Sequence, residues 1–326
     1  MEEFSKGATL AWIWHISALP DRLTHVRNQW MSRIKRKSIA LSVLVVSTAV
    51  GAPVAAQTAG PANVNYSLFN PVPDDKLRDL STDRPGKSHS AITVDAGHIQ
   101  VESDFLNYTY DPHGNGNVTT HAYSIGTPIL KLGVTNWMDI ELGLALFNGL
   151  HQSSNSSTVN SNWDVSAHGF GDTLLGAKVN AFGNDGGDQS LAFLPFLKIP
   201  TSSPGLGNGH AEFTLNVPYT IALSKLWSLT LEPNIGVLRN IDNTDYRGDY
   251  GFIANLSRPI LIKGLTAAVE VAVDASSEKK AGTKLSFDPS LQYLVSKNLQ
   301  LDVGVYLGLN QATPRYNPYI GISYRF

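Results

Sequence analysis

The last ten residues of the chain, NPYIGISYRF, alternate strictly between large apolar or aromatic side chains and small or polar ones. Ile320, Ile322, Tyr324 and Phe326 would share one face of a strand, because successive side chains point to opposite sides. Most chain termini fray unless something holds them. A pattern kept to the final residue therefore predicts that the last strand pairs with another strand.

The same period of two recurs from about residue 97 onward, and no segment keeps a helical period. The segments have about the length of tilted transmembrane strands, roughly 9–11 residues, whereas strands of soluble sandwiches are nearer 5–6. Pro195, Pro218, Pro233 and Pro289 fall inside them and predict bulges or local breaks. The pattern predicts twelve strands, at roughly 97–110, 119–132, 138–150, 168–182, 189–200, 211–223, 227–238, 249–261, 265–275, 283–295, 299–310 and 316–326.

The connections between these strands alternate in length. Polar and mostly long connections, such as TSSPGLGNGH and NIDNTDYRGD, alternate with short ones, such as SKL, IKG and SKN. This asymmetry is typical of outer-membrane barrels, which have long outer loops and short periplasmic turns. We therefore predict an all-β fold, a transmembrane antiparallel β-barrel of about 12 strands with meander topology, over residues 96–326.

Closure of such a barrel explains the ordered C-terminus. The last strand must pair with the first, since an open edge in lipid would leave backbone groups unsatisfied at several kcal/mol each. A terminal aromatic residue also fits the girdle of these barrels. We interpret Tyr324 and Phe326 as an assembly signal for the barrel-assembly machinery, and we expect outer-membrane lipids around the barrel.

The region before the barrel contains an export signal. Residues 31–56 combine a basic start, an apolar stretch from Ile39 to Val50 and small residues up to Ala56, which predicts a signal peptide cleaved after Ala56; a membrane anchor is the alternative. We interpret residues 1–30 as a spurious extension and Met31 as the start. Residues 57–95 are expected to be a periplasmic N-terminal segment, and the protein to be exported to the outer membrane of a Gram-negative bacterium.

Charge and composition exclude several function classes. Removal of residues 1–56 takes 7 of the 25 basic and 3 of the 27 acidic residues, leaving 18 and 24 and a formal charge of −6. No basic stripe remains, so nucleic acid is not expected as a partner. The absence of cysteine excludes a disulfide framework or a cysteine nucleophile. The nine histidines form no metal-binding motif, and we expect no metal and no cofactor.

Several stretches resemble a known bacterial family. They are Asp83-Arg84-Pro85-Gly86, the block GFGDTLLGAKVNAFG at 169–183, LKIPTS at 197–202 and the closing NPYIGISYRF. Together they resemble the family "putative MetA-pathway of phenol degradation" over about residues 80–326. The resemblance implies an outer-membrane barrel, transporter-like, that passes aromatic or other hydrophobic compounds.

Charged residues recur on the second face of the expected strands. Because lysine or arginine on the lipid side at mid-depth costs about 2–4 kcal/mol, these residues should face the lumen. They would form either a polar conduit that selects solutes or ion pairs that fill a narrow barrel. The expected lumen-lining residues are Glu102, Asp104, Glu141, Asp172, Lys178, Lys198, Glu212, Glu232, Glu270, Asp288 and Asp302.

Two further motifs contain residues that could serve as a gate or as catalytic groups. Asp83 and Arg84 precede the first strand and could form a plug or gate, with Arg84 paired to carboxylates such as Glu102 or Glu141; an exposed turn is the alternative. His151, Ser153 and Asn155 have a spacing loosely like that of outer-membrane phospholipases. We place them in a loop, where no strand would hold them in the geometry of an activated nucleophile, and we expect no enzyme.

The sequence thus favours an outer-membrane, porin-like channel for passive passage of a small molecule. The alternative is a blocked structural barrel that acts through its outer loops, chiefly residues 151–167.

Overall fold

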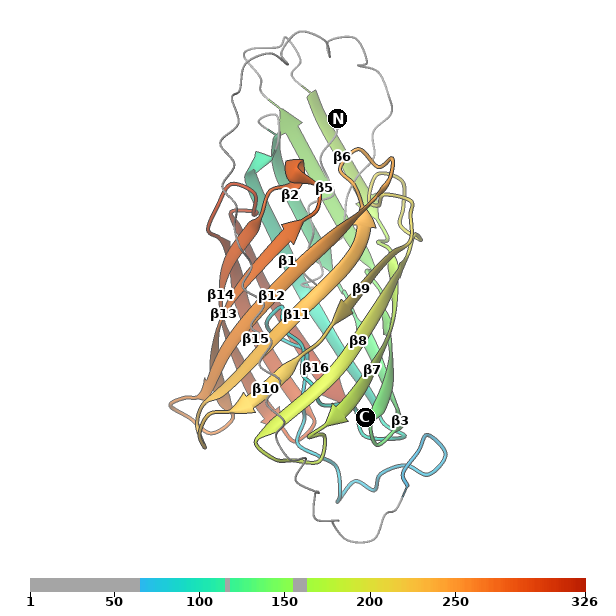
Figure 1. Ribbon diagram of the computed structural model, residues 1–326, viewed down its shortest axis with the longest axis vertical. Helices are drawn as coiled ribbons and strands as arrows, with labels where there is room; N and C mark the ends of the chain where they lie inside the picture. The colour runs from blue at the N-terminus through green and yellow to red at the C-terminus, as the bar shows by residue number, and fades with distance from the viewer. Residues whose placement is uncertain (1–64, 115–117, 155–162) are drawn as a thin grey trace. The chain divides into compact units, whose positions relative to one another are not determined.

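The computed structural model describes residues 65–114, 118–154 and 163–326 of the chain; the expected signal peptide and extension lie outside them. The strands form one antiparallel sheet in which β1 (Ile99–Gly114) pairs with β16 (Tyr316–Arg325), so that the sheet closes on itself (Figure 1). The described residues hold a single short 3₁₀ turn, η1 (Lys279–Ala281), and no helix that could span a membrane. The prediction of an all-β barrel is confirmed.

Sixteen strand segments make twelve positions around the barrel, as predicted, because four of the expected strands are interrupted. The interrupted strands are β2 (Val118–Ile125) with β3 (Ile129–Thr135), β4 (Met138–Gly143) with β5 (Phe147–Ser154), β6 (Trp163–Gly169) with β7 (Thr173–Phe182), and β9 (Glu212–Asn216) with β10 (Tyr219–Ala222). The others are β8 (Gln189–Ile199), β11 (Ser228–Arg239), β12 (Tyr246–Pro259), β13 (Leu265–Ser276), β14 (Lys284–Ser296) and β15 (Leu299–Gly308).

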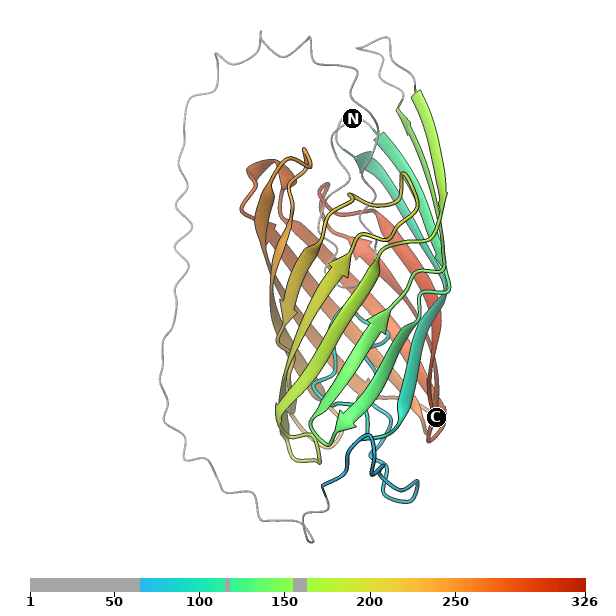
Figure 2. The ribbon, with the colours of Figure 1, turned by 90° about the vertical axis from the view of Figure 1, so that its right-hand side faces the viewer.

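Three of these interruptions lie side by side in the wall. The backbone of Leu146 donates to Gly126, and that of Gly171 donates to Ala145, each at 2.9 Å. Gly126 takes a positive φ of 65°, which favours glycine, and begins the first interruption. Beyond this row β2, β5 and β6 continue past the neighbouring strands (Figure 2), and among the described strands β6 pairs only with β5.

The four prolines that the sequence pattern placed inside strands lie where the ladder is interrupted on one side. Pro218 separates β9 from β10, and Pro233 faces it at a point where β11 passes from one to the other. Pro195 of β8 and Pro289 of β14 are paired with one neighbouring strand. On the other side, two residues including the proline have no partner in β7 and β15, respectively. Proline has no backbone N–H to donate to a neighbouring strand. At each interruption the ladder lacks a hydrogen bond, so the missing N–H costs nothing there.

The C-terminal residue takes part in the closing seam. The amide of Phe326 donates to the carbonyl of Ile99 at 2.8 Å, and its ring meets Tyr324 edge-on, with centroids 4.6 Å apart. Arg325 points inward to Asp95 at 3.0 Å. The seam therefore holds the strand to its end; the assembly role of Tyr324 and Phe326 stays a prediction.

The two faces of the wall differ in chemistry. Large apolar side chains such as Val271, Val303 and Ile320 are exposed on the outside, whereas charged side chains of the same strands are buried inside. In a soluble protein such an extended apolar surface would favour aggregation. The outer surface thus suits contact with hydrocarbon.

Arginine at Val271, in the middle of β13, is expected to lower the free energy of unfolding by about 2–4 kcal/mol. The same substitution at Ile262, in the turn between β12 and β13, should cost about 0–1 kcal/mol, because it lies near the membrane boundary. Urea unfolding of protein reconstituted in lipid vesicles measures both. Equal costs at the two positions would contradict a lipid-facing outer wall.

Candidate functional site

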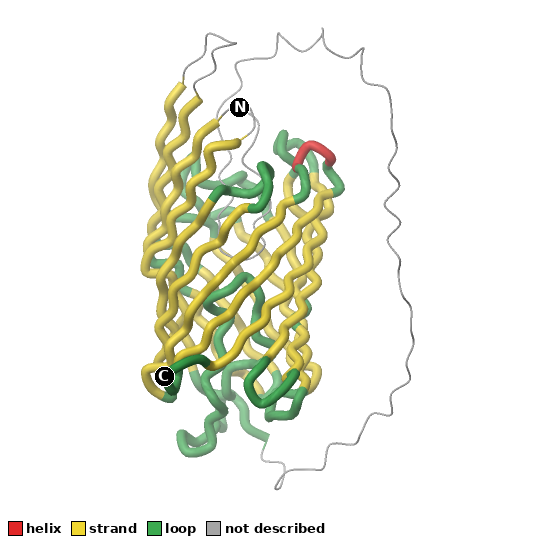
Figure 3. Tube along the Cα trace, turned by 90° about the vertical axis from the view of Figure 1, so that its left-hand side faces the viewer, coloured by secondary structure: helices red, strands yellow, loops and turns green. Residues whose placement is uncertain are grey.

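Residues 82–94, here called the lumen segment, pass inside the barrel before β1 begins. Figure 3 shows this stretch as loop within the ring of strands, and its hydrogen bonds reach β1, β4, β11 and β13. Of the N-terminal segment expected over residues 57–95, residues 82–94 thus lie inside the barrel, and the periplasmic placement of the stretch stays a prediction. This stretch has no strand periodicity because it bonds to side chains of the wall rather than to a strand ladder.

Arg84 lies between two carboxylates of the wall. Its Nε and Nη2 donate to Asp302 at 3.0 and 2.7 Å, and its Nη1 lies 2.6 Å from Oδ1 of Asp104. Burial would lower the pKa of Arg84, but the two carboxylates outweigh it and raise that pKa. Gly321 of β16 leaves the space, because a Cβ there would overlap the guanidinium.

Asp83 points to the other side of the lumen, toward two buried lysines. It forms ion pairs with Lys131 of β3 and with Lys178 of β7, the latter at 2.7 Å. It also accepts the backbone N–H of Ser90 at 2.7 Å, which closes the segment into a loop. Burial would raise the pKa of Asp83, but the lysines overcome that effect and hold it well below the ordinary value.

The following residues bind four further strands. The backbone amides of Lys87 and Ser88 donate to Glu270 at 2.8 and 3.0 Å, and the Lys87 ammonium lies 3.0 Å from Asp288. His89 contacts Glu232 through its backbone N–H at 2.6 Å and through Nδ1 at 2.8 Å. Asp139 then accepts the amide of Val94 at 2.8 Å.

All eleven expected lumen-lining residues are buried. Asp172, Lys198 and Glu212 form a separate cluster, in which Lys198 lies 3.4 Å from Asp172 and 2.8 Å from Glu212. Glu141 lies 3.6 Å from Lys178 without touching the lumen segment. The seven others contact the segment directly: Glu102, Asp104, Lys178, Glu232, Glu270, Asp288 and Asp302. Their part in selecting solutes remains a prediction.

The partners expected for Arg84 were wrong in detail. Glu102 and Glu141 lie beside Lys131, at the side of the lumen that Asp83 faces. Asp104 and Asp302 lie on the opposite side of the lumen from Lys131 and, in the described part of the chain, have no lysine of the wall as a partner. Arg84 therefore binds these two carboxylates. The alternation of ILKLGVT could have identified Lys131 as inward, since its neighbours Ile129 and Gly133 share its buried face; the partners Lys87 and His89 carry no such signal.

The structure also corrects the setting of His151 and Ser153. Both lie on β5, which runs to Ser154, and β6 begins at Trp163, so most of the expected loop 151–167 is strand. The ring nitrogen Nδ1 of His151 meets Ser166 at 3.0 Å and Asp164 at 3.4 Å. A catalytic relay needs one hydrogen-bond partner on each ring nitrogen of the histidine. Here Ser166 and Asp164 both contact the same nitrogen, Nδ1. Asn155 lies outside the described residues.

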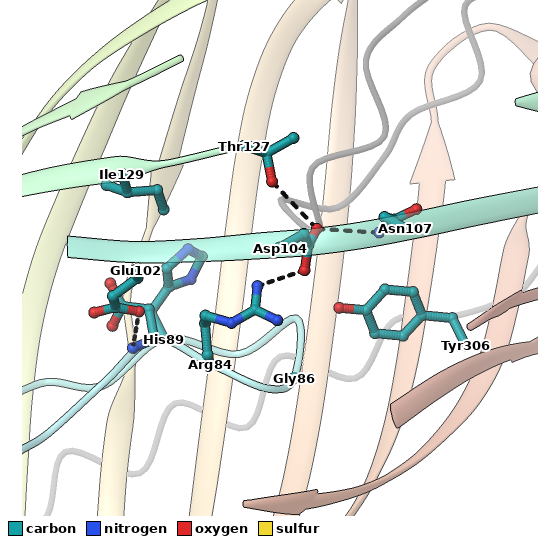
Figure 4. A pocket seen from close by; sticks show the side chains of 10 residues that line it. Arg84, Gly86, His89, Glu102, Asp104, Asn107, Thr127, Ile129 and Tyr306 are labelled. Atoms are coloured by element: carbon teal, nitrogen blue, oxygen red, sulfur yellow. Dashed lines mark hydrogen bonds and ion pairs between the residues drawn. The ribbon is translucent and has the colours of Figure 1, made fainter. Parts of the chain in front are cut away.

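A small pocket remains beside the lumen segment (Figure 4). It is lined by Arg84, Asp104 and Asn107 among others, and Thr127 lies at its edge where β2 and β3 separate. Figure 4 shows the guanidinium of Arg84 pointing at Asp104, with the Tyr306 ring beside it. The pocket therefore lies between the lumen segment and the wall.

Comparisons with known proteins agree with this architecture. Among solved structures, the chain is similar to the COG4313 outer membrane channel from Pseudomonas putida F1, with a TM-score of 0.51 and 15% identity over 70% of this chain and 95% of that one. It is also similar to the KdgM porin, with a TM-score of 0.45 and 12% identity over 70% and 99%. These likenesses concern the fold. No curated protein matches the sequence.

The family comparison covers both the lumen segment and the barrel. The sequence profile described as "Putative MetA-pathway of phenol degradation" matches residues 82–326, beginning at the lumen segment and ending at the closing strand. The chain therefore belongs to this family of barrel proteins.

Proposed function

We propose that the protein is an outer-membrane channel of a Gram-negative bacterium for passive passage of small compounds, and that the lumen segment is its plug. The observation that carries this proposal is a closed barrel, apolar outside and charged inside, whose lumen is occupied by a loop held through ion pairs. Such pairs can be exchanged for other partners, whereas a packed apolar core cannot. The family name favours aromatic or hydrophobic solutes.

Solute entry tests the channel itself. Proteoliposomes carrying the protein, and cells with and without its gene, are compared for uptake of phenolic and of polar compounds. Uptake above that of protein-free vesicles supports the channel. The second candidate, a permanently blocked barrel, is favoured by the docked segment, and it predicts that neither the protein nor variants of residues 82–94 pass any solute.

The plug should loosen as pH rises above 6.5, the ordinary pKa of histidine. Burial would lower the pKa of His89, but Glu232 from β11 and Asp83 of the segment outweigh burial and the repulsion of Lys178 from β7, so that this pKa is raised. The contact is then complete below the ordinary value of 6.5 and is lost as pH rises through the raised pKa. The loss is at most about 1.36 kcal/mol, or tenfold, per pH unit.

Bilayer conductance between pH 6 and pH 9 measures this dependence. Asp83 and Arg84 keep their charges over that range, because their pKa values move away from it. The dependence should weaken in His89→Gln, which keeps a hydrogen-bonding side chain without the titration. A His89→Gln protein with an unchanged pH profile would show that another group controls opening.

A further inference from the structure

The wall around the lumen segment is much more acidic than it is basic. Two lysines, Lys131 and Lys178, contact the segment, against seven carboxylates: Glu102, Asp104, Asp139, Glu232, Glu270, Asp288 and Asp302. The lysines also have carboxylate neighbours within the wall, Glu102 and Glu141. Four of the carboxylates, Asp104, Glu232, Asp288 and Asp302, make their ion pairs in the described chain only with the segment.

The place of the Arg84 side chain has the features of a guanidinium site. Asp302 binds the guanidinium through two of its nitrogens, and Asp104 binds the third. The ring of Tyr319 lies 5.7 Å from Cζ, within the range of a cation–π contact. All three wall residues are buried, so these contacts are shielded from water.

An ammonium site adjoins it. The Lys87 ammonium meets Asp288 at 3.0 Å, the hydroxyl of Ser286, and the face of the Tyr306 ring at 4.7 Å from its centroid. Tyr306 and Tyr319 lie against each other, with centroids 4.7 Å apart, and join the two sites. Oδ1 of Asp288, although buried, accepts no hydrogen bond within the described residues and can take a further donor.

We propose that Asp104, Asp288, Asp302, Tyr306 and Tyr319, here called the cation cradle, bind small organic cations that carry guanidinium or ammonium groups. The lumen segment occupies this site as a tethered ligand through Arg84 and Lys87. The inference rests on the proposed channel and deepens it, since it gives the solute a charge. Aromatic rings flanked by carboxylates suit an organic cation better than a neutral or an anionic solute.

A free cation must compete with the tethered charges of Arg84 and Lys87, which are present at the site at a high local concentration. A short linker holds its ligand at an effective concentration in the millimolar range. A soluble cation should therefore displace the lumen segment of the native channel only at millimolar concentration and should bind more readily once the tethered charges are removed. Agmatine, which carries a guanidinium and an ammonium group on one short chain, is a suitable probe; butylurea is an uncharged control.

The experiment uses the full exported chain in planar bilayers. The double variant Arg84→Gln, Lys87→Gln should conduct, prefer K⁺ to Cl⁻, and lose its K⁺ current when agmatine, but not butylurea, is added. Adding Asp288→Asn and Asp302→Asn should weaken the agmatine block by about tenfold or more, because two charged contacts are lost. Adding Asp164→Asn instead, an exposed acidic residue outside the lumen, should leave the block unchanged.

The outcomes separate the inference from the proposed function. Conductance that prefers Cl⁻, or that agmatine does not block, overturns the cation cradle and leaves the channel standing. Silence of every variant overturns the channel itself. If the double variant fails to fold, as judged by its heat-dependent migration on gels, the native chain supplies the test: millimolar agmatine should displace the lumen segment and speed its cleavage by trypsin at Lys87, and an unchanged cleavage rate would refute the cradle.

Discussion

Arg84→Ala is expected to convert a mostly closed barrel into a conducting one. The substitution leaves Asp104 and Asp302 buried without their cation, and removing one partner of a buried pair typically costs about 3–5 kcal/mol. That cost falls on the docked state alone, because both carboxylates can be hydrated once the segment has left. Single-channel recordings should show the open time rising by about a hundredfold or more.

Two controls locate the effect. Arg84→Lys keeps the charge but cannot bind Asp302 through two nitrogens while reaching Asp104, so it should give an intermediate open time. Lys297→Ala removes a cation outside the lumen, whose side chain donates a hydrogen bond to the carbonyl of Asp74 at 3.4 Å; it should behave as the native protein. Equal open times for the native chain and Arg84→Ala would refute the plug.

The wall of this barrel could be predicted closely from the sequence. Alternation along strands such as LTAAVEVAVDA assigns Glu270 to one face and Val271 to the other, and a one-residue error would have put carboxylates into lipid. The final aromatic residue indicated closure, and the pairing of β16 with β1 confirms it. These features could be predicted because each depends on period and position alone.

The lumen segment could not be predicted in the same way. Its amides are satisfied by carboxylates such as Glu270 and Glu232, which are more than 140 positions distant in the chain. Pairing of this kind depends on which side chains meet across a closed barrel, and no local pattern encodes it. The interruption at Gly126 carried a local signal, glycine two residues before Pro128, which becomes recognisable only beside its neighbours in the wall.

The motif Asp83-Arg84-Pro85-Gly86 illustrates the difference. Its resemblance to a family was visible in the sequence, but its chemistry depends on both sides of the lumen. Asp83 needs Lys131 and Lys178, whereas Arg84 needs Asp104 and Asp302. Gly86 passes so close to the wall that a Cβ would lie 2.6 Å from Oε2 of Glu270. The motif is therefore a set of opposed anchors rather than a turn.

Lys131→Met should have the largest effect on the wall itself. The Lys131 ammonium is the shared partner of Asp83 and Glu102, and Glu141 lies 4.0 Å away. Methionine has similar length without charge, so packing is nearly kept while these carboxylates face one another. The expected cost is about 3–5 kcal/mol of unfolding free energy, because Asp83 and Glu102 are both buried in the docked state and lose their shared cation. Urea unfolding in lipid vesicles measures this cost.

A second substitution tests whether uncompensated charge is the cause. Glu102→Gln in the Lys131→Met background removes one of the unpaired carboxylates and keeps a hydrogen-bonding group for the amide of Asp83, which Glu102 accepts at 2.9 Å. If charge is responsible, the double variant should be more stable than Lys131→Met alone, although Glu102→Gln by itself should destabilise the native wall. Lys225→Met, at an exposed turn, controls for the loss of a lysine as such. Additive costs in the double variant would instead mean that Lys131 acts through packing, and the lumen would then be held by shape rather than by exchangeable ion pairs.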